Sequence, residues 1–341
     1  MSIYNSTTNA FQVVDRTNEI LLLPENPTLM SDSGMWQEEF LATRTVTFEE
    51  RKGSLSLVKD QVQGAKPFTT GNDLRKLHSY TMTHHPMMDA LFPQDIAAQL
   101  RPGALNAELD TKDRALLWKM EKIRKSYDRT LNFARFRTLA AGDLFAPNGT
   151  ISGNLYTDFS LTRNSVNFAL ATPTTNVLDK CEEVIAGFMS AASEGEEIRK
   201  VTAYCSGGFF SALINHPKVA SAYNLYAAVA PQQISRDRAG GLGMYRRFVF
   251  SNIEFIEVIQ SVDGTPLVNV DEAVFVADDG DGSFMSYFGP AQRFGLVNTV
   301  AEKNYLWVYE DGRGTQVTME AESNFINLLR KPAFVATGTK A

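Results

Sequence analysis

Histidines and cysteines are the residues of this chain best suited to metal or nucleophilic chemistry, and their spacing argues against both. His84 and His85 are adjacent, so in a strand they point to opposite faces and cannot bind one metal ion together. His78 shares a face with His84, but no carboxylate or cysteine stands at ligand spacing. Cys205 ends an apolar run and Cys181 lies on the apolar side of an amphipathic stretch, and the two make no metal or disulfide pattern. We therefore expect no metal site, and two buried cysteines in a protein made in a reducing cytosol.

Two further stretches resemble parts of known sites. The acidic run at 278–282 resembles the start of a calcium loop, but Gly289 or a neighbour occupies the position of the bidentate Glu, which predicts a surface loop. Ser206 precedes two glycines after an apolar run and could expose a nucleophile or help to bind an anion. Because no His stands near it in sequence as a base, we expect a plain helix N-cap. With no phosphate-binding loop, nucleophile elbow or dinucleotide fingerprint, the sequence predicts no catalytic residue and no cofactor.

Composition indicates a globular chain with a sizeable core. The 341 residues are 44% hydrophobic, enough for one elaborate domain or two ordinary ones. The apolar runs, such as 20–23, are all far too short to cross a bilayer, and the N-terminus lacks the basic start and apolar centre of a signal peptide. We therefore expect no membrane association.

Charge is unevenly distributed along the chain. The net charge of −6 argues against a dedicated nucleic-acid binder, yet residues 108–140 carry nine Lys or Arg against five acids. Residues 251–341 reverse this, with thirteen acids against six bases. Solvated helix and loop faces would explain the pattern. A surface near a polyanion, or one that pairs with an acidic patch on a neighbour, would explain it as well.

The segment 43–86 predicts a long hairpin. Val46 and Phe48, and further on Leu55 and Leu57, alternate with polar residues on the outgoing strand. Tyr80 and Met82 do so on the return. Between them lies a turn-rich stretch with almost nothing apolar to form a core. Because such a hairpin is unstable in isolation, we expect another copy of the protein to provide the surface it lies on.

The remaining elements fall into a recognisable order. Residues 1–42 are polar with scattered apolar anchors, and we expect a neighbouring subunit to hold them. A helix opens near Pro93, a long helix over 108–140 has one apolar stripe, and a second hairpin follows it. From 173 helices and strands alternate in a mixed α/β unit. The last forty residues return to strands, with a hairpin turn at Asp311 and a separate final strand beginning at Asn324.

This order resembles the major capsid protein of tailed phages, and more narrowly the lambda-type family, the phage major capsid protein E family. The resemblance covers about 40–340 and depends on the linear order of six segments rather than on one motif. The segments are TRTVTFEERKGSLSLV, HSYTMTHHPMMDALFPQDI, RTLNFARFRTLAAGDLFAPNGTISGNLYTDFSL, YCSGGFFSALINHPKVASAY, RFVFSNIEFIEV and SNFINLLRKPAFVATG.

The resemblance implies an α+β fold, the Hong Kong 97-like capsid fold of tailed phages. Its parts would be an N-terminal arm (1–42), an extended loop region (43–86), a peripheral domain with a long spine helix (87–172), an axial domain (173–300) and a return to the peripheral domain (301–341). The loop at 52–84 would lie across an adjacent subunit.

The implied function is structural. Copies would assemble into the pentamers and hexamers of an icosahedral head that encloses double-stranded DNA, after synthesis in the host cytoplasm. Lys119, Lys122 and Lys125 of the spine helix would face the DNA non-specifically through its phosphates. The expected partners are further copies, a portal protein, a decoration protein and a separate scaffolding protein, since the stretch before the hairpin is too short for a scaffolding segment.

Some questions stay open at this stage. Some relatives form a covalent crosslink between a Lys and an Asn. In this chain the lysines in or near the loop are Lys52, Lys59, Lys66 and Lys76, but the sequence does not position an Asn acceptor. A cellular encapsulating shell of the same fold would enclose an enzyme instead of DNA. An uncharacterised α/β enzyme would be a monomer or small oligomer with an apolar pocket.

Overall fold

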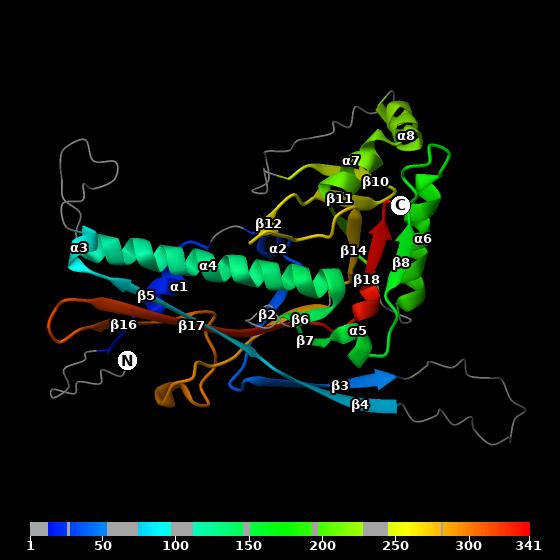
Figure 1. Ribbon diagram of the computed structural model, residues 1–341. Coiled ribbons are helices and arrows are strands. Elements are labelled where there is room, and N and C mark those ends of the chain that lie inside the picture. The colour runs from blue at the N-terminus through cyan, green and yellow to red at the C-terminus, as the bar shows by residue number, and fades with distance from the viewer. Residues whose placement is uncertain are drawn as a thin grey trace, which may run out of the picture.

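Two six-stranded sheets, one long helix and a projecting hairpin are the main elements of the part of the chain that the structure describes (Figure 1). This computed structural model describes residues 13–25, 28–52, 74–96, 112–145, 151–192, 197–227, 245–280 and 282–341. In the described part no helix combines the length and apolar composition needed to span a bilayer.

The first sheet is built around one long strand, β17 (Val317–Leu329). The order is β1 (Val13–Asp15), β16 (Tyr305–Glu310), β17, β15 (Phe284–Phe288) and β2 (Gln37–Phe40), and β5 (Thr83–Leu91) pairs with β17 off this path. The expected separate strand beginning at Asn324 is wrong. Asn324 continues β17 because β5 pairs with it and β15 pairs with the next residues, so the ladder has no break.

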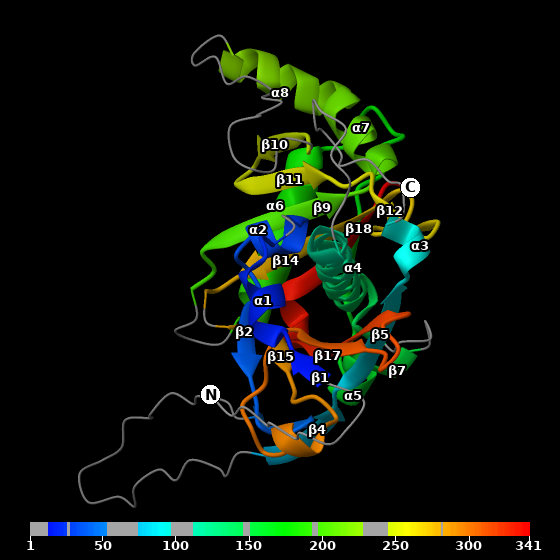
Figure 2. The same ribbon diagram turned by 90° about the vertical axis from the view of Figure 1, so that its left-hand side faces the viewer.

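The helix α4 (Lys112–Ala141) lies along one face of this sheet (Figures 1 and 2). Its apolar stripe is buried as the sequence predicted, through Leu116, Met120, Ile123, Tyr127, Leu131 and Ala134. The helix ends at Gly142, whose φ of +73° and whose N–H bond to the Thr138 carbonyl (2.8 Å) form a left-handed C-cap. A Cβ at Gly142 would lie 2.5 Å from the Tyr156 ring, so glycine is required for space as well as for φ.

The second sheet is the sheet of the α/β unit that the sequence predicts from residue 173 onward. Its order is β10 (Arg247–Phe250), β11 (Ile253–Glu257), β9 (Lys200–Cys205), β14 (Glu272–Asp278), β18 (Val335–Thr339) and β8 (Asn164–Asn167). Both faces are covered, so β14 is almost entirely apolar. Phe275 joins the core formed with α6 (Val177–Ala191) and α7 (Gly207–Asn215), while Val274 and Val276 join the core shared with α4.

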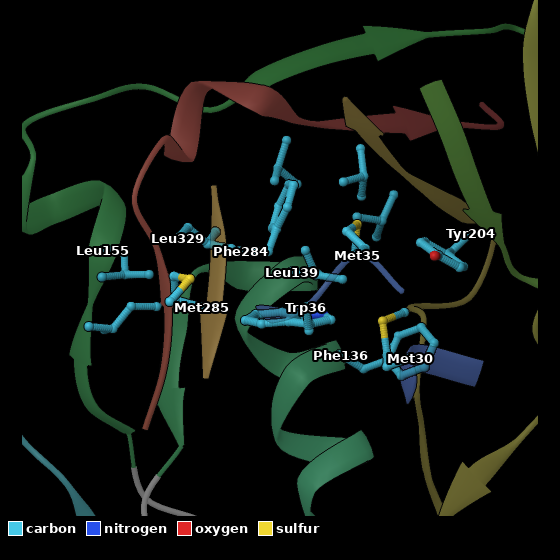
Figure 3. Packing of buried hydrophobic residues seen from close by; sticks show 14 of the residues in the cluster. Met30, Met35, Trp36, Phe136, Leu139, Leu155, Tyr204, Phe284, Met285 and Leu329 are labelled. Atoms are coloured by element: carbon cyan, nitrogen blue, oxygen red, sulfur yellow. The ribbon is translucent and has the colours of Figure 1, made fainter. Parts of the chain in front are cut away.

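That shared core joins the two halves of the molecule (Figure 3). Phe136 of α4 meets Tyr204 of the second sheet edge-to-face at 5.7 Å. Trp36 meets Phe284 of the first sheet in the same way at 5.9 Å. Aromatic pairs of this kind add about 0.5–1.5 kcal/mol each beyond area burial, so the halves pack as one body along α4.

The hairpin β3 (Thr45–Lys52) and β4 (Leu74–Thr81) confirms the predicted pairing, with Val46 opposite Tyr80 and Phe48 opposite His78. Leu55 and Leu57, which the alternation places on the outgoing strand, lie outside the described residues, as does the rest of 53–73. The second predicted hairpin is β6 (Asp143–Phe145) with β7 (Ile151–Asn154). The remaining elements are α1 (Thr17–Leu22), α2 (Leu29–Asp32), α3 (Pro93–Ile96), α5 (Leu155–Asp158), α8 (Pro217–Ala227), β12 (Ser261–Val262), β13 (Thr265–Pro266), η1 (Phe294–Leu296) and η2 (Pro332–Phe334).

The chain crosses between the sheets more often than the proposed domain boundaries suggest. β15 belongs to the first sheet although it lies within 173–300, and β18 belongs to the second although it lies within 301–341. β8, within 87–172, also joins the second sheet. The pairing between β14 and β18 therefore brings the end of the chain back to the α/β unit.

The expectation that a neighbouring subunit holds the N-terminal segment is wrong for its described residues, because this chain holds them itself. β1 pairs with β16, and β2 pairs in parallel with β15. Ile20 of α1 and Met30 of α2 are fully buried in two different cores. The polar composition concealed these contacts because only a few side chains of the segment are apolar. Residues 1–12 lie outside the described part.

Candidate interaction surfaces

The basic face of α4 is the first candidate surface. Lys122, Lys125 and Arg129 are exposed and follow one another at spacings of three and four, which places them on one side of the helix. Lys125 and Arg129 have carboxylates nearby, each at 3.8 Å: Glu121 and Asp263. Exposed pairs of this length contribute little, about 0–1 kcal/mol, so the cations remain available to a partner.

Lys119 lies apart from the other two lysines. It donates to Asp89 Oδ1 at 2.8 Å and to the Ala90 carbonyl at 2.5 Å, and its side chain is 15% exposed. An α-helix turns about 100° per residue, so Lys119 and Lys125 are about 120° apart around the axis. Lys119 is thus engaged with the edge strand β5 and stabilises the fold. Its spacing alone did not show this, because Lys119 is as close to Lys122 around the axis, about 60°, as Lys122 is to Lys125.

The base of the hairpin is fixed to the subunit itself. The ring of Phe159, which follows α5, stacks on Phe48 and His78 at 6.0 and 4.7 Å between centroids. Tyr80 donates to Asp158 Oδ2 at 3.0 Å, and Lys76 Nζ donates to the Asp158 carbonyl at 2.7 Å. Because β4 is followed by β5 after Met82 alone, the same ribbon runs from the projecting end into the first sheet.

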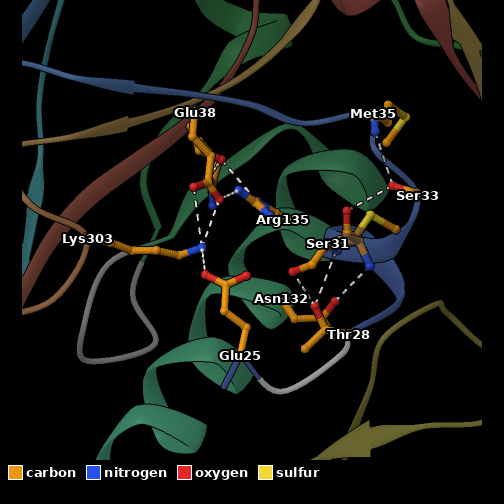
Figure 4. Close-up of polar contacts among 12 residues, drawn as sticks. Glu25, Thr28, Ser31, Ser33, Met35, Glu38, Asn132, Arg135 and Lys303 are labelled. Carbon is orange, nitrogen blue, oxygen red and sulfur yellow. Dashed lines mark hydrogen bonds and ion pairs between the residues drawn. The ribbon is translucent and has the colours of Figure 1, made fainter. Parts of the chain in front are cut away.

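A partly buried ionic network joins the N-terminal segment to α4 and to the first sheet (Figure 4). Arg135 is 1% exposed and donates to Glu38 Oε1 at 2.8 Å and to Ser286 Oγ at 3.0 Å. Lys303 Nζ donates to Glu38 Oε1 at 3.1 Å and to Glu25 Oε1 at 3.2 Å. Burial alone would raise the pKa of Glu38, but Lys303 and Arg135 outweigh it and hold that pKa below its ordinary value of 4.5.

Sequence reasoning missed this network. In the sequence Arg135 is one of the nine basic residues of 108–140, with nothing to set it apart. Glu38 and Lys303 lie 97 and 168 positions from it. No local pattern joins residues so far apart. The one available signal was a charge on the apolar-flanked part of α4, between Ala134 and Phe136, where a buried cation needs a partner.

The prediction that His84 and His85 point to opposite faces of the strand is confirmed. His85 is buried between the sheet and α4, stacks on Phe325 at 4.4 Å, and has its pKa lowered to about 4 by burial and by His84. His84 lies on the other face, with Nδ1 2.8 Å from Asn324 Oδ1 and 3.2 Å from Glu322. Within the described residues no three His, Cys, Asp or Glu side chains gather as metal ligands would.

The other candidate chemical residues have structural roles. Ser206 caps α7 by accepting from the Phe209 N–H at 3.4 Å, as predicted. Cys181 and Cys205 are buried and unbridged, and burial raises the pKa of the Cys181 thiol to about 12. In the acidic run, Asp279 is not a surface residue: it is buried and accepts from Ser283 Oγ at 2.6 Å and Lys331 Nζ at 2.8 Å.

The face of the first sheet that points away from α4 is a second surface with exposed apolar groups. Met88 lies opposite Glu320 on this face and is 71% exposed. The connection before β16 covers part of the face, where the Arg293 guanidinium lies 3.9 Å from the centre of the Trp307 ring. Phe294, next to Arg293, is fully exposed. Exposed groups of this kind suit contact with another protein surface.

Comparison with known proteins places this geometry in context. A family model described as phage major capsid protein E matches residues 13–340. The chain is 35% identical to the major capsid protein of Pseudomonas phage KPP10, over 98% of this chain and 99% of that protein. It is 25% identical to the major capsid protein of Salmonella phage Felix O1 (isolate Felix O1-VT1), over 96% of each.

The fold is also similar to a solved structure. The mature capsid of bacteriophage PhiM1 has a chain that matches with a TM-score of 0.54 at 10% identity, covering 93% of this chain and 88% of that one. At this identity the similarity concerns the fold alone, and the fold agrees with the Hong Kong 97-like architecture expected from the sequence.

Proposed function

Because this chain belongs to the phage major capsid protein E family, we propose that its copies form the pentamers and hexamers of an icosahedral head around double-stranded DNA. The protein is a phage major capsid protein, a structural component of the head that associates with itself and is not an enzyme. Our proposal adds that its capsomers are pentamers and hexamers and that the enclosed polymer is double-stranded DNA.

One observation supports the assembly proposal above the others, namely the hairpin β3–β4. Its base is fixed by Phe159 and Asp158, while the paired strands lead away from both sheets (Figure 1). Leu77, on the face of the hairpin opposite Phe48 and Tyr80, is 70% exposed. A ribbon held firmly at one end, with an apolar side chain exposed on the face that its own subunit does not cover, suits a contact across an adjacent subunit.

In this proposal the first sheet with α4 is the peripheral domain, and the second sheet with its helices is the axial domain around the capsomer's symmetry axis. A portal protein, a separate scaffolding protein and a decoration protein at the positions between capsomers complete the set of partners. Synthesis takes place in the host cytoplasm before the subunits join the head.

Electron microscopy of the purified protein tests the proposal, with the chain expressed alone and together with its neighbouring open reading frames. We expect closed shells with fivefold and sixfold capsomers, filled with DNA when they are isolated from infected cells. A uniformly small soluble oligomer under every condition would contradict it. Shells filled by an enzyme would instead favour a cellular encapsulating role.

We also propose that the basic face of α4 contacts packaged DNA through phosphates. Neutralising Lys122 and Lys125 together with Gln should make filled heads release DNA at a lower temperature, because each lost phosphate contact weakens a salt-dependent attraction. Dye access to the DNA during heating, at two salt concentrations, measures the release.

Two control variants test whether the change in DNA release is specific to Lys122 and Lys125. Lys180→Gln changes a lysine of α6 that is paired with Glu183 at the surface, and should leave release unchanged. Lys119→Gln should lower subunit stability through the lost bond to Asp89 without a specific effect on DNA. Unchanged DNA release from the Lys122 and Lys125 double variant would reject the proposed contact.

A further inference from the structure

A groove of about 600 Å³ lies between α4 on one side and Thr28, Tyr245 and the segment 260–262 on the other. Its α4 side includes Trp118 and the cations Lys122, Lys125 and Arg129, with Glu121 as the one carboxylate of the lining. The groove therefore has apolar and cationic groups side by side.

Trp118 is a large aromatic side chain of this groove that is not packed into the core. Its side chain is 63% exposed, whereas Met120 and Leu116 beside it are buried against the sheet. Trp118, Lys122, Lys125 and Arg129 occupy positions i, i+4, i+7 and i+11, so they form one stripe along the helix. A large aromatic side chain at the head of a cationic stripe gives the groove a polarity along its length.

The charge of the stripe is only weakly compensated by this chain. Glu121 lies 3.8 Å from Lys125, and Asp263, itself 94% exposed, lies 3.8 Å from Arg129. Both separations exceed hydrogen-bond length, and both partners are exposed to water. Three cations against one carboxylate in the lining leave a positive groove on a chain whose net charge is −6. A ligand that fits must be acidic.

The apolar groups decide which acidic ligand fits better. Double-stranded DNA presents phosphates at its surface and keeps the flat faces of its bases stacked inside, so it offers Trp118 nothing to pack against. An amphipathic helix of a protein offers both, with apolar side chains on one face and carboxylates beside them. Trp and Arg are also the residues that most often dominate protein–protein binding energy.

We propose that this groove binds an acidic amphipathic helical segment of a partner protein, with its apolar side chains against Trp118 and its carboxylates on Lys122, Lys125 and Arg129. The proposal goes beyond the DNA contacts suggested above, because it assigns a protein ligand and a role to Trp118. It applies to the unassembled subunit, so it holds whichever way α4 faces in the shell.

A designed helical peptide with Leu on one face and Glu on the other is the probe. Its binding to the unassembled full-length subunit is measured by fluorescence anisotropy at two salt concentrations. Trp118→Ala should weaken binding about tenfold or more, as expected for loss of an aromatic anchor. The Lys122→Gln, Lys125→Gln double variant should weaken binding and flatten its salt dependence. Because all three side chains are exposed, thermal unfolding of the subunit should not change.

Controls on α6 match these variants. Met189 is 67% exposed and Lys180 is paired at the surface, so Met189→Ala and Lys180→Gln should bind the peptide as the wild type does. A peptide with Lys in place of Glu should not bind. Filled heads carrying Trp118→Ala should retain DNA normally, which separates this proposal from the DNA contact.

Three results would overturn the proposal. One is the absence of measurable binding of the Leu/Glu peptide to the wild-type subunit, and another is binding that Trp118→Ala leaves unchanged. The third is a DNA duplex that displaces the peptide and itself depends on Trp118, which would make the groove a nucleic-acid site.

Discussion

Replacing Glu38 with Gln should lower the free energy of unfolding of the unassembled subunit by about 3 kcal/mol. The reason is the position of Arg135, which is 1% exposed and has Glu38 as its carboxylate partner at 2.8 Å. Without that carboxylate a buried guanidinium keeps its desolvation cost while losing its closest counter-charge. Urea denaturation followed by circular dichroism measures the change.

A matched exposed pair provides the control. Lys180 and Glu183 lie 2.8 Å apart on the surface of α6, and Glu183→Gln should change the free energy of unfolding by less than about 0.5 kcal/mol. Replacing both Glu38 and Arg135 with Met should cost less than the single change at Glu38, because no unpaired charge from this pair is then left buried. Equal decreases in the free energy of unfolding for Glu38→Gln and Glu183→Gln would show that the Glu38–Arg135 pair stabilises the fold no more than an exposed ion pair does.

The same substitution should alter the pH dependence of stability. The pKa of Glu38 in the folded subunit lies below its ordinary value of 4.5. Its ionised form therefore stabilises the fold fully above pH 4.5, and this contribution is lost as the pH falls through the folded pKa. The difference in unfolding free energy between wild type and Glu38→Gln should accordingly shrink below pH 4.5. A difference that stays constant or grows there would contradict this assignment.

Shortening the hairpin should abolish shell formation while leaving the subunit folded. Residues 53–73 can be replaced by Asn-Gly, a two-residue hairpin turn, because Lys52 and Leu74 stand opposite each other at the end of the described strands β3 and β4. The contacts at the base, from Phe48 and Tyr80 to Phe159 and Asp158, remain. We expect an unchanged thermal unfolding curve, together with small oligomers in sedimentation and no closed shells in electron micrographs.

A Gly/Ser segment of the original length tests whether length alone is enough. It keeps the reach of the segment and removes the side chains that would contact a neighbour, so we expect it to fail as well. Shells at wild-type yield from the short-turn variant would show that the segment is not an assembly arm. A lowered unfolding temperature in that variant would show that the segment stabilises its own subunit.

Local patterns predicted the elements that have a strong period of their own. The apolar stripe of α4 recurs every three or four residues, and the strands of the hairpin alternate every two, so both could be placed from sequence. The N-cap at Ser206 and the opposite faces of His84 and His85 followed from the same short-range geometry. The family followed from the order of six segments, which is also linear information.

Long-range pairing was beyond such reasoning. Nothing local shows that β2 pairs with β15, or that β18 leaves the first sheet for the second, because strand partners are chosen by the packing of the whole chain. The polar segment before the hairpin was therefore assigned to a neighbour, although its few apolar side chains fill cores of its own subunit.

By itself, the sequence determined the long helix α4, the helices of the α/β unit, the hairpin and the capsid family, because these depend on residue periods and on order along the chain. Only the tertiary structure decided which charges are free. In the folded chain Arg135 is buried against Glu38, and Lys119 is paired with Asp89. Lys122, Lys125 and Trp118 instead lie exposed along one groove. Whether a charged side chain stabilises the fold or meets a partner depends on what lies across from it in space, and residues distant in the chain supply those neighbours.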